Sequence, residues 1–359
     1  MKIAVLGSRG IPNRYGGFEE MAAQVAPLWV KAGHEVVVYS TSNHPEKATE
    51  FEGVRIKHIF NPEGTFGLAG QFIYDLLCIL HARREGFDVY VQLGYTTSGI
   101  WSFLWPKKKT LTNMDGLEHQ RAKYKGFTSL FLRWSERRAV KRSKLLIADN
   151  PEIARYLTKY KKPTKTIAYG SHVVDPSKNA VQILKESGLP AENFHLHIGR
   201  IQPDNHVWEI LEAAEETGEV LVAVGDYSTK YGKKLKRIFN EPNIHFPGTI
   251  YDKRVLNALR TQATFYLHGH SVGGTNPALL EAMGCGSMVL AHNNPFNASV
   301  LGGLGGLWKD QEELARLIVQ RPSANVRAEQ SKIAKARVSE YFNWTLIAQQ
   351  YLGAMEVIK

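Results

Sequence analysis

The chain has 359 residues, 43% of them hydrophobic and 22% charged, which is typical of a soluble globular protein with room for two domains. The best apolar run, Phe72 to Leu80, contains Asp75 and is much shorter than the ~18 residues that a membrane span needs. The first residues lack the apolar core of a signal peptide, and Cys78 and Cys285 give neither a disulfide framework nor metal-ligand spacing. We therefore expect a cytoplasmic chain.

The formal net charge of +11 has several explanations. It fits a nucleic-acid binder, a protein at an anionic membrane surface, an enzyme for phosphorylated substrates, or a merely well-solvated protein. Nucleic acid is the weakest of these, because no nucleic-acid-binding motif accompanies the charge.

Short β-branched runs alternate with longer amphipathic stretches. The predicted strands are 2–6, 35–39, 54–60, 89–93, 109–113 and 145–148, then 194–198, 220–224, 243–246, 264–268 and 288–291. Apolar residues at helical spacing predict helices over 18–32 and 206–217. This alternation predicts an α/β fold with two Rossmann-like parallel-sheet domains, residues 1–170 and 171–339, that face a central cleft.

Glycines follow the first predicted strand. Gly7 to Pro12 ends that strand, and Gly16 and Gly17 open the next helix, with Arg9 and Arg14 beside them. Such a turn lets backbone N–H groups approach a phosphate at the positive end of a helix. The Rossmann spacing G-x-G-x-x-G is absent, so an ordinary strand-to-helix turn is the alternative.

A polar loop, Thr112 to Arg121, follows the fifth predicted strand. Asp115 or Glu118 can orient sugar hydroxyls, and His119 can lie near a phosphate or a transferred proton. The alternative is that Asp115 only caps the following helix.

Arg200 stands just after the first strand of the second domain, where a guanidinium can make paired hydrogen bonds to a diphosphate. A surface ion pair with a carboxylate is the alternative for Arg200.

The strongest signal is the stretch His268 to Met283, in which a strand leads into a glycine-rich turn and a helix. Asn276 can cap this helix, and Glu281 can accept hydrogen bonds from two ribose hydroxyls. The alternatives are a routine capped helix and a solvated acid in its first turns. Histidines such as His268 and His270 more often pack in or beside a core than take part in chemistry.

These motifs resemble the GT-B glycosyltransferases of family 4, and more narrowly a rhamnosyltransferase-like subgroup with the motif seen at 7–12 and 15–19. The resemblance covers nearly the whole chain. It implies an acceptor-side N-terminal domain, a donor-binding C-terminal domain, and a C-terminal helix, 340–359, that crosses back onto the first domain.

The resemblance also assigns residues. It implies that Arg200 binds the donor diphosphate and that Glu281 binds the ribose. Two positions depart from the family's pattern: Asn205 stands where a second cation is usual, and Gly273 stands where an acid that faces the sugar is usual. These departures allow either an inactive relative or a different donor, such as a 6-deoxyhexose. The expected catalytic residues are Arg200, Asp115 and His119, and the expected donor-binding residues are Gly16, Gly17, Asn205, Gly273, Gly274, Thr275, Asn276 and Glu281.

The implied reaction is retaining and metal-independent transfer of a sugar, L-rhamnose from dTDP-rhamnose first, to a glycan or lipid-linked glycan. No D-x-D lies at a strand end to hold a cation, and no cofactor is expected beyond the nucleotide-sugar co-substrate. A sugar-nucleotide 2-epimerase and a non-enzymatic two-lobed ligand-binding protein remain as alternatives.

Basic and aromatic residues are interleaved from Lys123 to Leu146, with Phe127, Leu130, Phe131 and Trp134 among them. This composition suits a helix at the surface of an anionic membrane, which would place the protein peripherally at the inner face of the membrane. The alternative is a helix whose apolar face packs inward.

Overall fold

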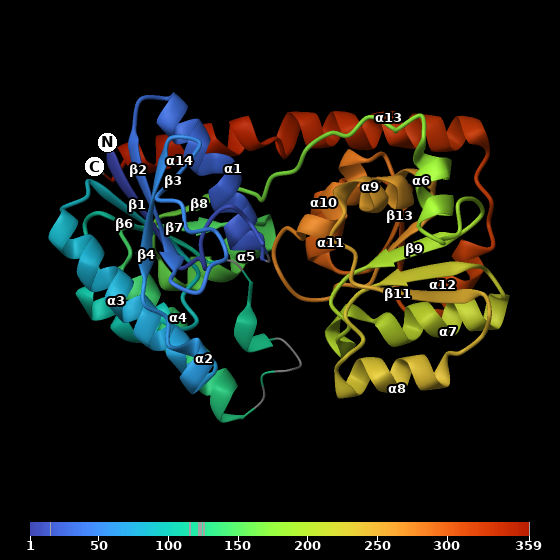
Figure 1. The fold of residues 1–359 in the computed structure, drawn as a ribbon, viewed down its shortest axis with the longest axis horizontal. Coiled ribbons are helices and arrows are strands. Elements are labelled where there is room, and N and C mark those ends of the chain that lie inside the picture. The colour runs from blue at the N-terminus through green and yellow to red at the C-terminus, as the bar shows by residue number, and fades with distance from the viewer. Residues whose placement is uncertain (15, 115, 121–123, 125, 359) are drawn as a thin grey trace. The chain divides into compact units, whose positions relative to one another are not determined.

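The computed structural model describes residues 1–14, 16–114, 116–120, 124 and 126–358. The chain forms two compact units (Figure 1). Unit 1 comprises Met1–Gly170 and Trp344–Lys359, and unit 2 comprises Ser171–Asn343.

Unit 1 contains an eight-stranded sheet of order β3-β4-β2-β1-β5-β6-β7-β8, parallel except where β3 pairs with β4. Its strands are β1 (Lys2–Leu6), β2 (Glu35–Thr41), β3 (Glu50–Phe51), β4 (Val54–Ile59), β5 (Val89–Leu93), β6 (Thr110–Asn113), β7 (Leu145–Ala148) and β8 (Thr164–Thr166). Its helices are α1 (Gly17–Lys31), α2 (Glu63–Phe66), α3 (Ala69–Glu85), α4 (Phe127–Arg142), α5 (Pro151–Leu157) and α14 (Trp344–Glu356), with short 3₁₀ turns η1 (Ser98–Leu104), η2 (Glu118–Gln120) and η3 (Thr158–Tyr160).

The last helix of the chain, α14, is built into unit 1. It packs on α1, where the Trp29 and Tyr351 rings lie 5.9 Å apart and Trp29 Nε1 donates to Ala348 O at 3.0 Å. Asn113 Nδ2, at the end of β6, donates to the Tyr351 hydroxyl at 2.8 Å. These buried partners satisfy the polar atoms of large aromatic side chains, as burial requires.

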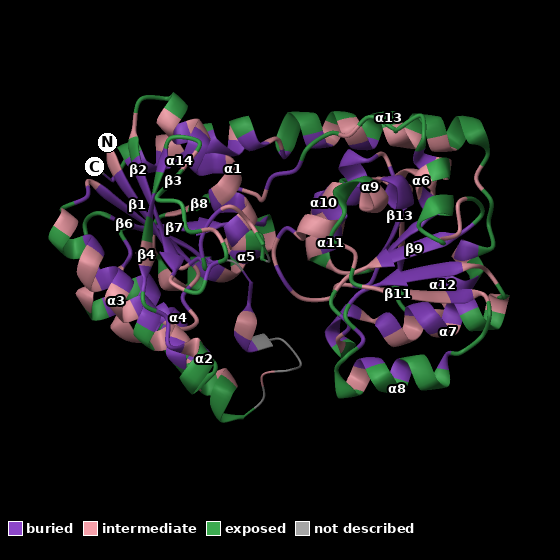
Figure 2. Cartoon of the chain, viewed as in Figure 1, coloured by how far each residue is buried: buried purple, intermediate pink, exposed green. Residues whose placement is uncertain are grey.

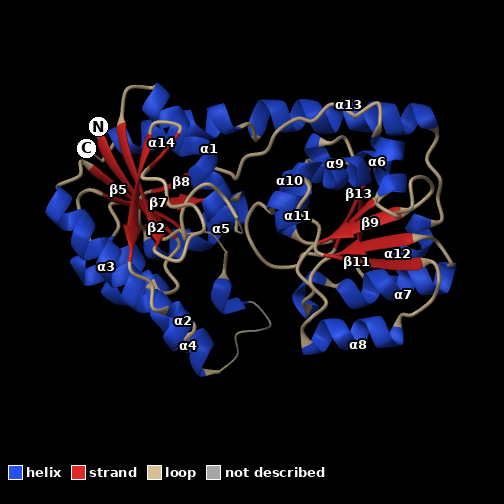
Figure 3. Cartoon of the chain, in the orientation of Figure 1, coloured by secondary structure: helices blue, strands red, loops and turns tan. Residues whose placement is uncertain are grey.

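Unit 2 contains a parallel six-stranded sheet of order β11-β10-β9-β12-β13-β14, with helices on both of its faces (Figure 3). Its strands are β9 (His195–Ile198), β10 (Leu221–Val224), β11 (Ile244–Gly248), β12 (Tyr266–His268), β13 (Val289–His292) and β14 (Gly306–Trp308). Its helices are α6 (Ala180–Glu186), α7 (Val207–Thr217), α8 (Lys230–Ile238), α9 (Lys253–Gln262), α10 (Pro277–Gly284), α11 (Pro295–Leu301), α12 (Gln311–Ile318) and α13 (Ala324–Tyr341), with the 3₁₀ turn η4 (Pro203–Asn205).

The strand order of unit 2 reverses between β9 and β12. From β9 the chain adds β10 and β11 on one side, and then returns to place β12, β13 and β14 on the other. The crossover helices on the two sides of this point, α7 and α10, lie on opposite faces of the sheet (Figure 3). In sheets of this kind, ligands bind beyond the carboxyl ends of the strands at such a point.

The predicted α/β class with two parallel-sheet, Rossmann-like units is confirmed. Every predicted strand is present, with ends shifted by at most two residues. The prediction missed β3, β8 and β14, which are short; Thr164 to Thr166, for example, is a largely exposed edge strand (Figure 2). Within the described part of the chain, no helix combines the length and apolarity that crossing a bilayer requires.

Candidate functional site

Arg200 lies at the switch point of unit 2. It stands two residues beyond the end of β9, in the loop that leads to η4, and its side chain is exposed. Its guanidinium makes no hydrogen bond or ion pair with any residue that the structure describes. Arg200 therefore does not form the alternative surface ion pair with a described residue, and its guanidinium is available for a ligand.

Asn205 holds this loop in shape. It lies at the end of η4 and is 5% exposed. Its Nδ2 donates to the Arg200 carbonyl oxygen at 2.7 Å, and its Oδ1 lies 2.7 Å from His270 Nδ1, beyond β12. Asn205, at the position where the family usually has a second cation, thus joins the two loops on either side of the switch point.

The loops after β9 and β12 are also packed directly against each other. Ser271 donates from both its backbone N and its Oγ to the Asp204 carbonyl oxygen, at 3.1 and 2.7 Å. A Cβ on Gly269 would lie 2.0 Å from the Asn205 carbonyl oxygen, so only glycine allows this approach. Hydrogen bonds and close packing therefore join the two loops at the carboxyl ends of β9 and β12.

The backbone conformation and the helix cap explain several residues of the glycine-rich turn before α10. Gly273 has φ +149°, a conformation that L side chains rarely adopt. Thr275 is buried, and Gly274 lies between them. Asn276 Oδ1 accepts from Ala278 N at 2.9 Å, and Pro277 is the first helical residue, so Asn276 acts as the predicted helix cap.

Glu281 is not simply a solvated acid. Its Oε2 forms an ion pair with Arg260 Nη2 of α9; the Arg260 side chain is 5% exposed, whereas that of Glu281 is 45% exposed. Arg260 thus holds the carboxylate in one orientation at the surface. Sequence reasoning missed Arg260, because nothing in its own segment marks it as a partner of Glu281.

In unit 1, the turn that contains Gly16 and Gly17 is already occupied by a carboxylate. Glu19 Oε1 accepts from Arg9 N at 2.7 Å, and a Cβ on Gly16 would lie 2.0 Å from Glu19 Oε2. Burial raises the pKa of Glu19, while the hydrogen bond from Arg9 opposes that rise. The Arg9 side chain pairs with Glu63 at 2.7 Å. Glu19 and Glu63 thus provide internal partners for Arg9 at this turn, as an ordinary strand-to-helix turn would have.

Of the predicted residues in the loop after β6, Asp115 lies outside the described residues, whereas His119 is buried. The His119 side chain is 3% exposed, with Nδ1 3.4 Å from Glu136 Oε2 and Nε2 3.2 Å from the Tyr156 hydroxyl. His119 therefore belongs to an internal polar network, and direct contact of its ring with a substrate is not what the geometry shows.

Glu136 of α4 is the centre of that network. Its carboxylate accepts from the hydroxyls of Tyr95 at 3.2 Å, Tyr156 at 2.8 Å and Tyr160. Burial alone would raise the pKa of Glu136, but hydrogen bonds from His119 and these tyrosines hold it at about 2. No sequence motif marks this cluster, because its members come from separate segments.

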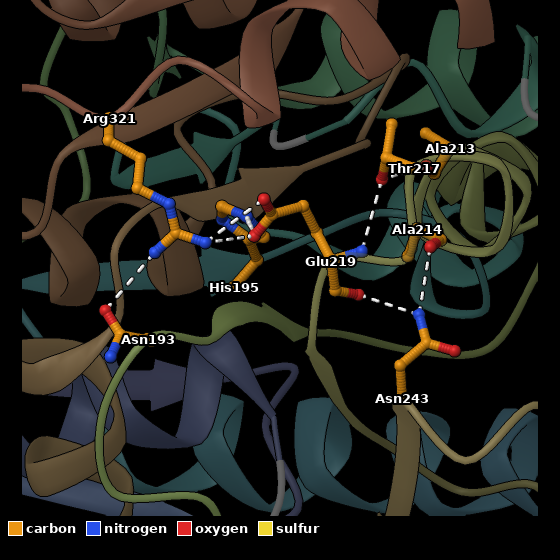
Figure 4. Close-up of polar contacts among 8 residues, drawn as sticks. All are labelled: Asn193, His195, Ala213, Ala214, Thr217, Glu219, Asn243 and Arg321. Carbon is orange, nitrogen blue, oxygen red and sulfur yellow. Dashed lines mark hydrogen bonds and ion pairs between the residues drawn. The ribbon is translucent and has the colours of Figure 1, made fainter.

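The opposite, amino end of β9 also carries charged residues (Figure 4). His195 Nε2 lies 3.4 Å from Glu219 Oε2, and Arg321 Nη2 donates to both Glu219 oxygens at 3.1 and 2.9 Å. Arg321 Nη1 also donates to Asn193 Oδ1 at 3.2 Å. Each of these side chains has a partner within unit 2.

Both halves of the chain match known sequence families. Residues 182–321 match the family described as Glycosyl transferases group 1, and residues 1–172 match a Domain of unknown function, DUF1972. The chain has the GT-B fold, and its second half is similar to the group 1 glycosyl transferases. These findings support a transferase.

The similar proteins agree with this assignment. An uncharacterized glycosyltransferase of Methanocaldococcus jannaschii is 27% identical over 150 residues, which are 38% of this chain and 36% of the relative. The match thus spans about a third of that relative's length. Sucrose-phosphate synthase from Thermosynechococcus elongatus has a similar structure, with a TM-score of 0.81, 19% identity, and coverage of 99% of this chain and 98% of that one. Anabaena HepE in complex with UDP-glucose gives a TM-score of 0.75 at 18% identity, covering 99% of this chain and 100% of HepE.

Proposed function

We propose that this chain transfers a sugar from a nucleotide donor to a glycan or lipid-linked glycan, with retention of configuration and without a metal ion. The observation that carries the proposal is Arg200, an exposed cation without a partner among the described residues, beside the switch point of a group 1 glycosyltransferase domain. In such sheets the crevice beyond the carboxyl ends of the strands is where ligands bind.

Each group at the site has a chemical role in this proposal. The Arg200 guanidinium binds the donor diphosphate and stabilises the charge that develops on it as the bond from the sugar C1 to the phosphate oxygen breaks. Glu281, held by Arg260, accepts hydrogen bonds from the ribose hydroxyls. Backbone N–H groups of Gly273 and Gly274 offer further donors to the sugar or phosphates.

In the transfer step, the acceptor hydroxyl oxygen forms the new bond to C1 on the face that the diphosphate leaves. The electron pair of the broken C1–O bond stays on the diphosphate. The leaving phosphate oxygen takes the proton of the acceptor hydroxyl, so no side chain is needed as a nucleophile.

For the sugar we propose a 6-deoxyhexose, with dTDP-rhamnose as the first candidate. Gly273 presents no side chain to the sugar, and its φ of +149° disfavours replacement by a carboxylate-bearing residue. A site without that acceptor does not penalise a sugar that lacks the matching hydroxyl.

We also propose that the outer surface of α4 contacts an anionic membrane. The inner face of α4 is buried through Leu132, Ala139 and Val140, so part of the helix packs inward. Its outer face nevertheless exposes Phe127 (83%) and Leu130 (64%), with Trp134, Arg133 and Arg137 also exposed. Exposed apolar side chains among cations are typical of interfacial helices.

Flotation with vesicles tests this surface. Wild-type protein should float with anionic vesicles at low salt and be released at high salt, because salt screens the attraction. Replacing Phe127 and Leu130 with serine should abolish flotation, whereas Tyr251→Ser, at a 75% exposed aromatic residue of unit 2, should not. Equal binding to neutral vesicles, or none to anionic ones, would contradict the proposal.

The experiment that tests the function is a panel of nucleotide sugars scored by release of the nucleoside diphosphate, with and without EDTA. We expect dTDP-rhamnose to be turned over fastest and EDTA to leave the rate unchanged. Much faster turnover of UDP-glucose would overturn the donor, and loss of activity that Mg²⁺ or Mn²⁺ restores would overturn the metal-independent mechanism. Isomerisation of the donor alone would instead identify a 2-epimerase.

A further inference from the structure

We propose that His270 is a second diphosphate-binding side chain of the donor site, on the opposite side of the switch point from Arg200. The inference rests on the proposed function, since it assumes that a nucleoside diphosphate binds there.

The positions of the two residues are equivalent. Arg200 stands two residues beyond Ile198, the last residue of β9, and His270 stands two residues beyond His268, the last residue of β12. The two strands are parallel neighbours, with Leu196 paired to Tyr266. Arg200 is exposed and His270 is partly exposed. A ligand that occupies the crevice between these strand ends and reaches Arg200 therefore also comes within reach of His270.

A chain of hydrogen bonds fixes which nitrogen of His270 carries the proton. Asn205 Nδ2 donates to the Arg200 carbonyl oxygen, so the atom that faces His270 Nδ1 is the acceptor Oδ1. His270 Nδ1 must then be the donor in this bond. Nε2 is consequently the nitrogen that gains a proton when the ring becomes positively charged, and in that state it donates N–H.

The backbone of His270 is held as firmly as its ring. Its carbonyl oxygen accepts from Asn294 Nδ2 at 3.0 Å and from Asn297 Nδ2 at 2.9 Å, both from the start of α11 beyond β13. The ring therefore keeps one orientation relative to the Arg200 loop. Such a preorganised donor loses little entropy when a ligand binds.

The neighbouring histidines do not compete for the charge. Burial lowers the pKa of His197 and lowers that of His268 well below the usual range, so both stay neutral at pH 7. A diphosphate at the crevice favours the positively charged form of His270, whose Nε2–H then makes a charge-assisted hydrogen bond to a phosphate oxygen. Asn205 is a positioning residue in this arrangement, because it acts through the Arg200 loop and the His270 ring.

Calorimetry with dTDP and UDP, compared with thymidine and uridine as competitors, separates diphosphate binding from base binding. His270→Asn keeps an amide N–H near the position of Nδ1, where it can still donate to Asn205 Oδ1, but it has no group at the position of Nε2 and cannot become charged. We expect it to weaken nucleoside diphosphate binding about tenfold or more and to leave nucleoside binding unchanged. Asn205→Ala should cause a smaller loss of the same kind, and His245→Gln, on edge strand β11 of the same unit, should cause none.

Wild-type affinity for the nucleoside diphosphate in His270→Asn would overturn the inference. So would an equal loss for the nucleoside, which together with a lowered melting temperature would show a structural role. If wild-type protein binds neither dTDP nor UDP, the donor site of the proposed function fails, and the assignment of His270 fails with it.

Discussion

The two ends of strand β9 carry similar residue types but use them differently. At the amino end, His195, Glu219 and Arg321 pair with one another, and Asn193 completes the group (Figure 4). At the carboxyl end, the Asn205 side chain holds two loops together, and the Arg200 guanidinium has no partner among the described residues. Residue type alone therefore does not indicate a ligand site. A charged side chain indicates one when it lies at the carboxyl end of the sheet and has no partner among the described residues.

The largest effect should come from removing the cation at the carboxyl end. We expect Arg200→Ala to lower kcat about 100-fold or more without lowering the melting temperature, because loss of one preorganised donor to the developing charge costs about 3 kcal/mol. Steady-state kinetics on the preferred donor would measure this. A variant with wild-type kcat would remove Arg200 from the site.

At the amino end, the predicted effect is on stability and depends on pH. Burial, opposed by Glu219, lowers the pKa of His195 to about 4. The unfolded state, with a histidine pKa near 6.5, then binds more protons than the folded state between about pH 4 and 6.5, so stability falls as the pH falls through that window. This single group can account for a loss of up to about 3 kcal/mol.

The matched variant is His195→Phe, which keeps an aromatic ring stacked on Phe265 but does not titrate. Urea unfolding at a series of pH values should show a shallower decline between pH 6.5 and 4 than in the wild type. Since His197, His268 and His292 also have lowered pKa values, only the difference between the two proteins reports His195. Identical slopes would show that His195 is not responsible.

A smaller effect is expected at Glu281, behind the carboxyl end of β12. Glu281→Gln keeps the shape but loses the charge that Arg260 holds, and it should weaken dTDP binding about tenfold, corresponding to about 1.4 kcal/mol. Calorimetry would measure the change. Unchanged affinity would show that the carboxylate does not bind the ribose.

The smallest effect should come from Arg321→Ala at the amino end. Arg321 is 53% exposed, so solvent screens its ion pair with Glu219, and we expect a loss of stability of at most about 1 kcal/mol. The kinetic constants should not change. A variant with much lower kcat would show that the amino end influences the chemistry.

The strand and helix pattern could be predicted from the sequence because β-branched runs and helical spacing are local signals. Arg200 and Asn276 could be proposed for a similar reason, since Arg200 follows a strand and Asn276 precedes the first residue of a helix. Glu281 was assigned from the resemblance to the glycosyltransferase family. The pairing of Arg260 with Glu281 could not be predicted, because it depends on how α9 lies against α10. The Glu136 network was missed for the same reason, and its presence removes His119 from solvent.

The structure adds partners at two of the predicted donor-binding positions. At the turn of Gly16 and Gly17, where a phosphate site and an ordinary strand-to-helix turn were the two alternatives, the buried carboxylate of Glu19 accepts from Arg9 N. Asn205 was expected only as a weakened phosphate contact, and the structure shows it as the residue that bridges Arg200 and His270. The contact of Asn205 with His270 could not be predicted, because the two residues are 65 positions apart in the sequence.

The position of the donor site can be tested by comparing Arg200→Ala with Arg321→Ala in calorimetric titrations with the nucleoside diphosphate that the wild type binds. The two variants remove the same side chain from opposite ends of one sheet. We predict that Arg200→Ala loses at least tenfold in affinity, since a charge-assisted phosphate contact contributes about 1.5–3 kcal/mol, and that Arg321→Ala binds as the wild type does. Equal affinities in both variants, or a larger loss in Arg321→Ala, would contradict the placement of the donor site at the carboxyl end of β9.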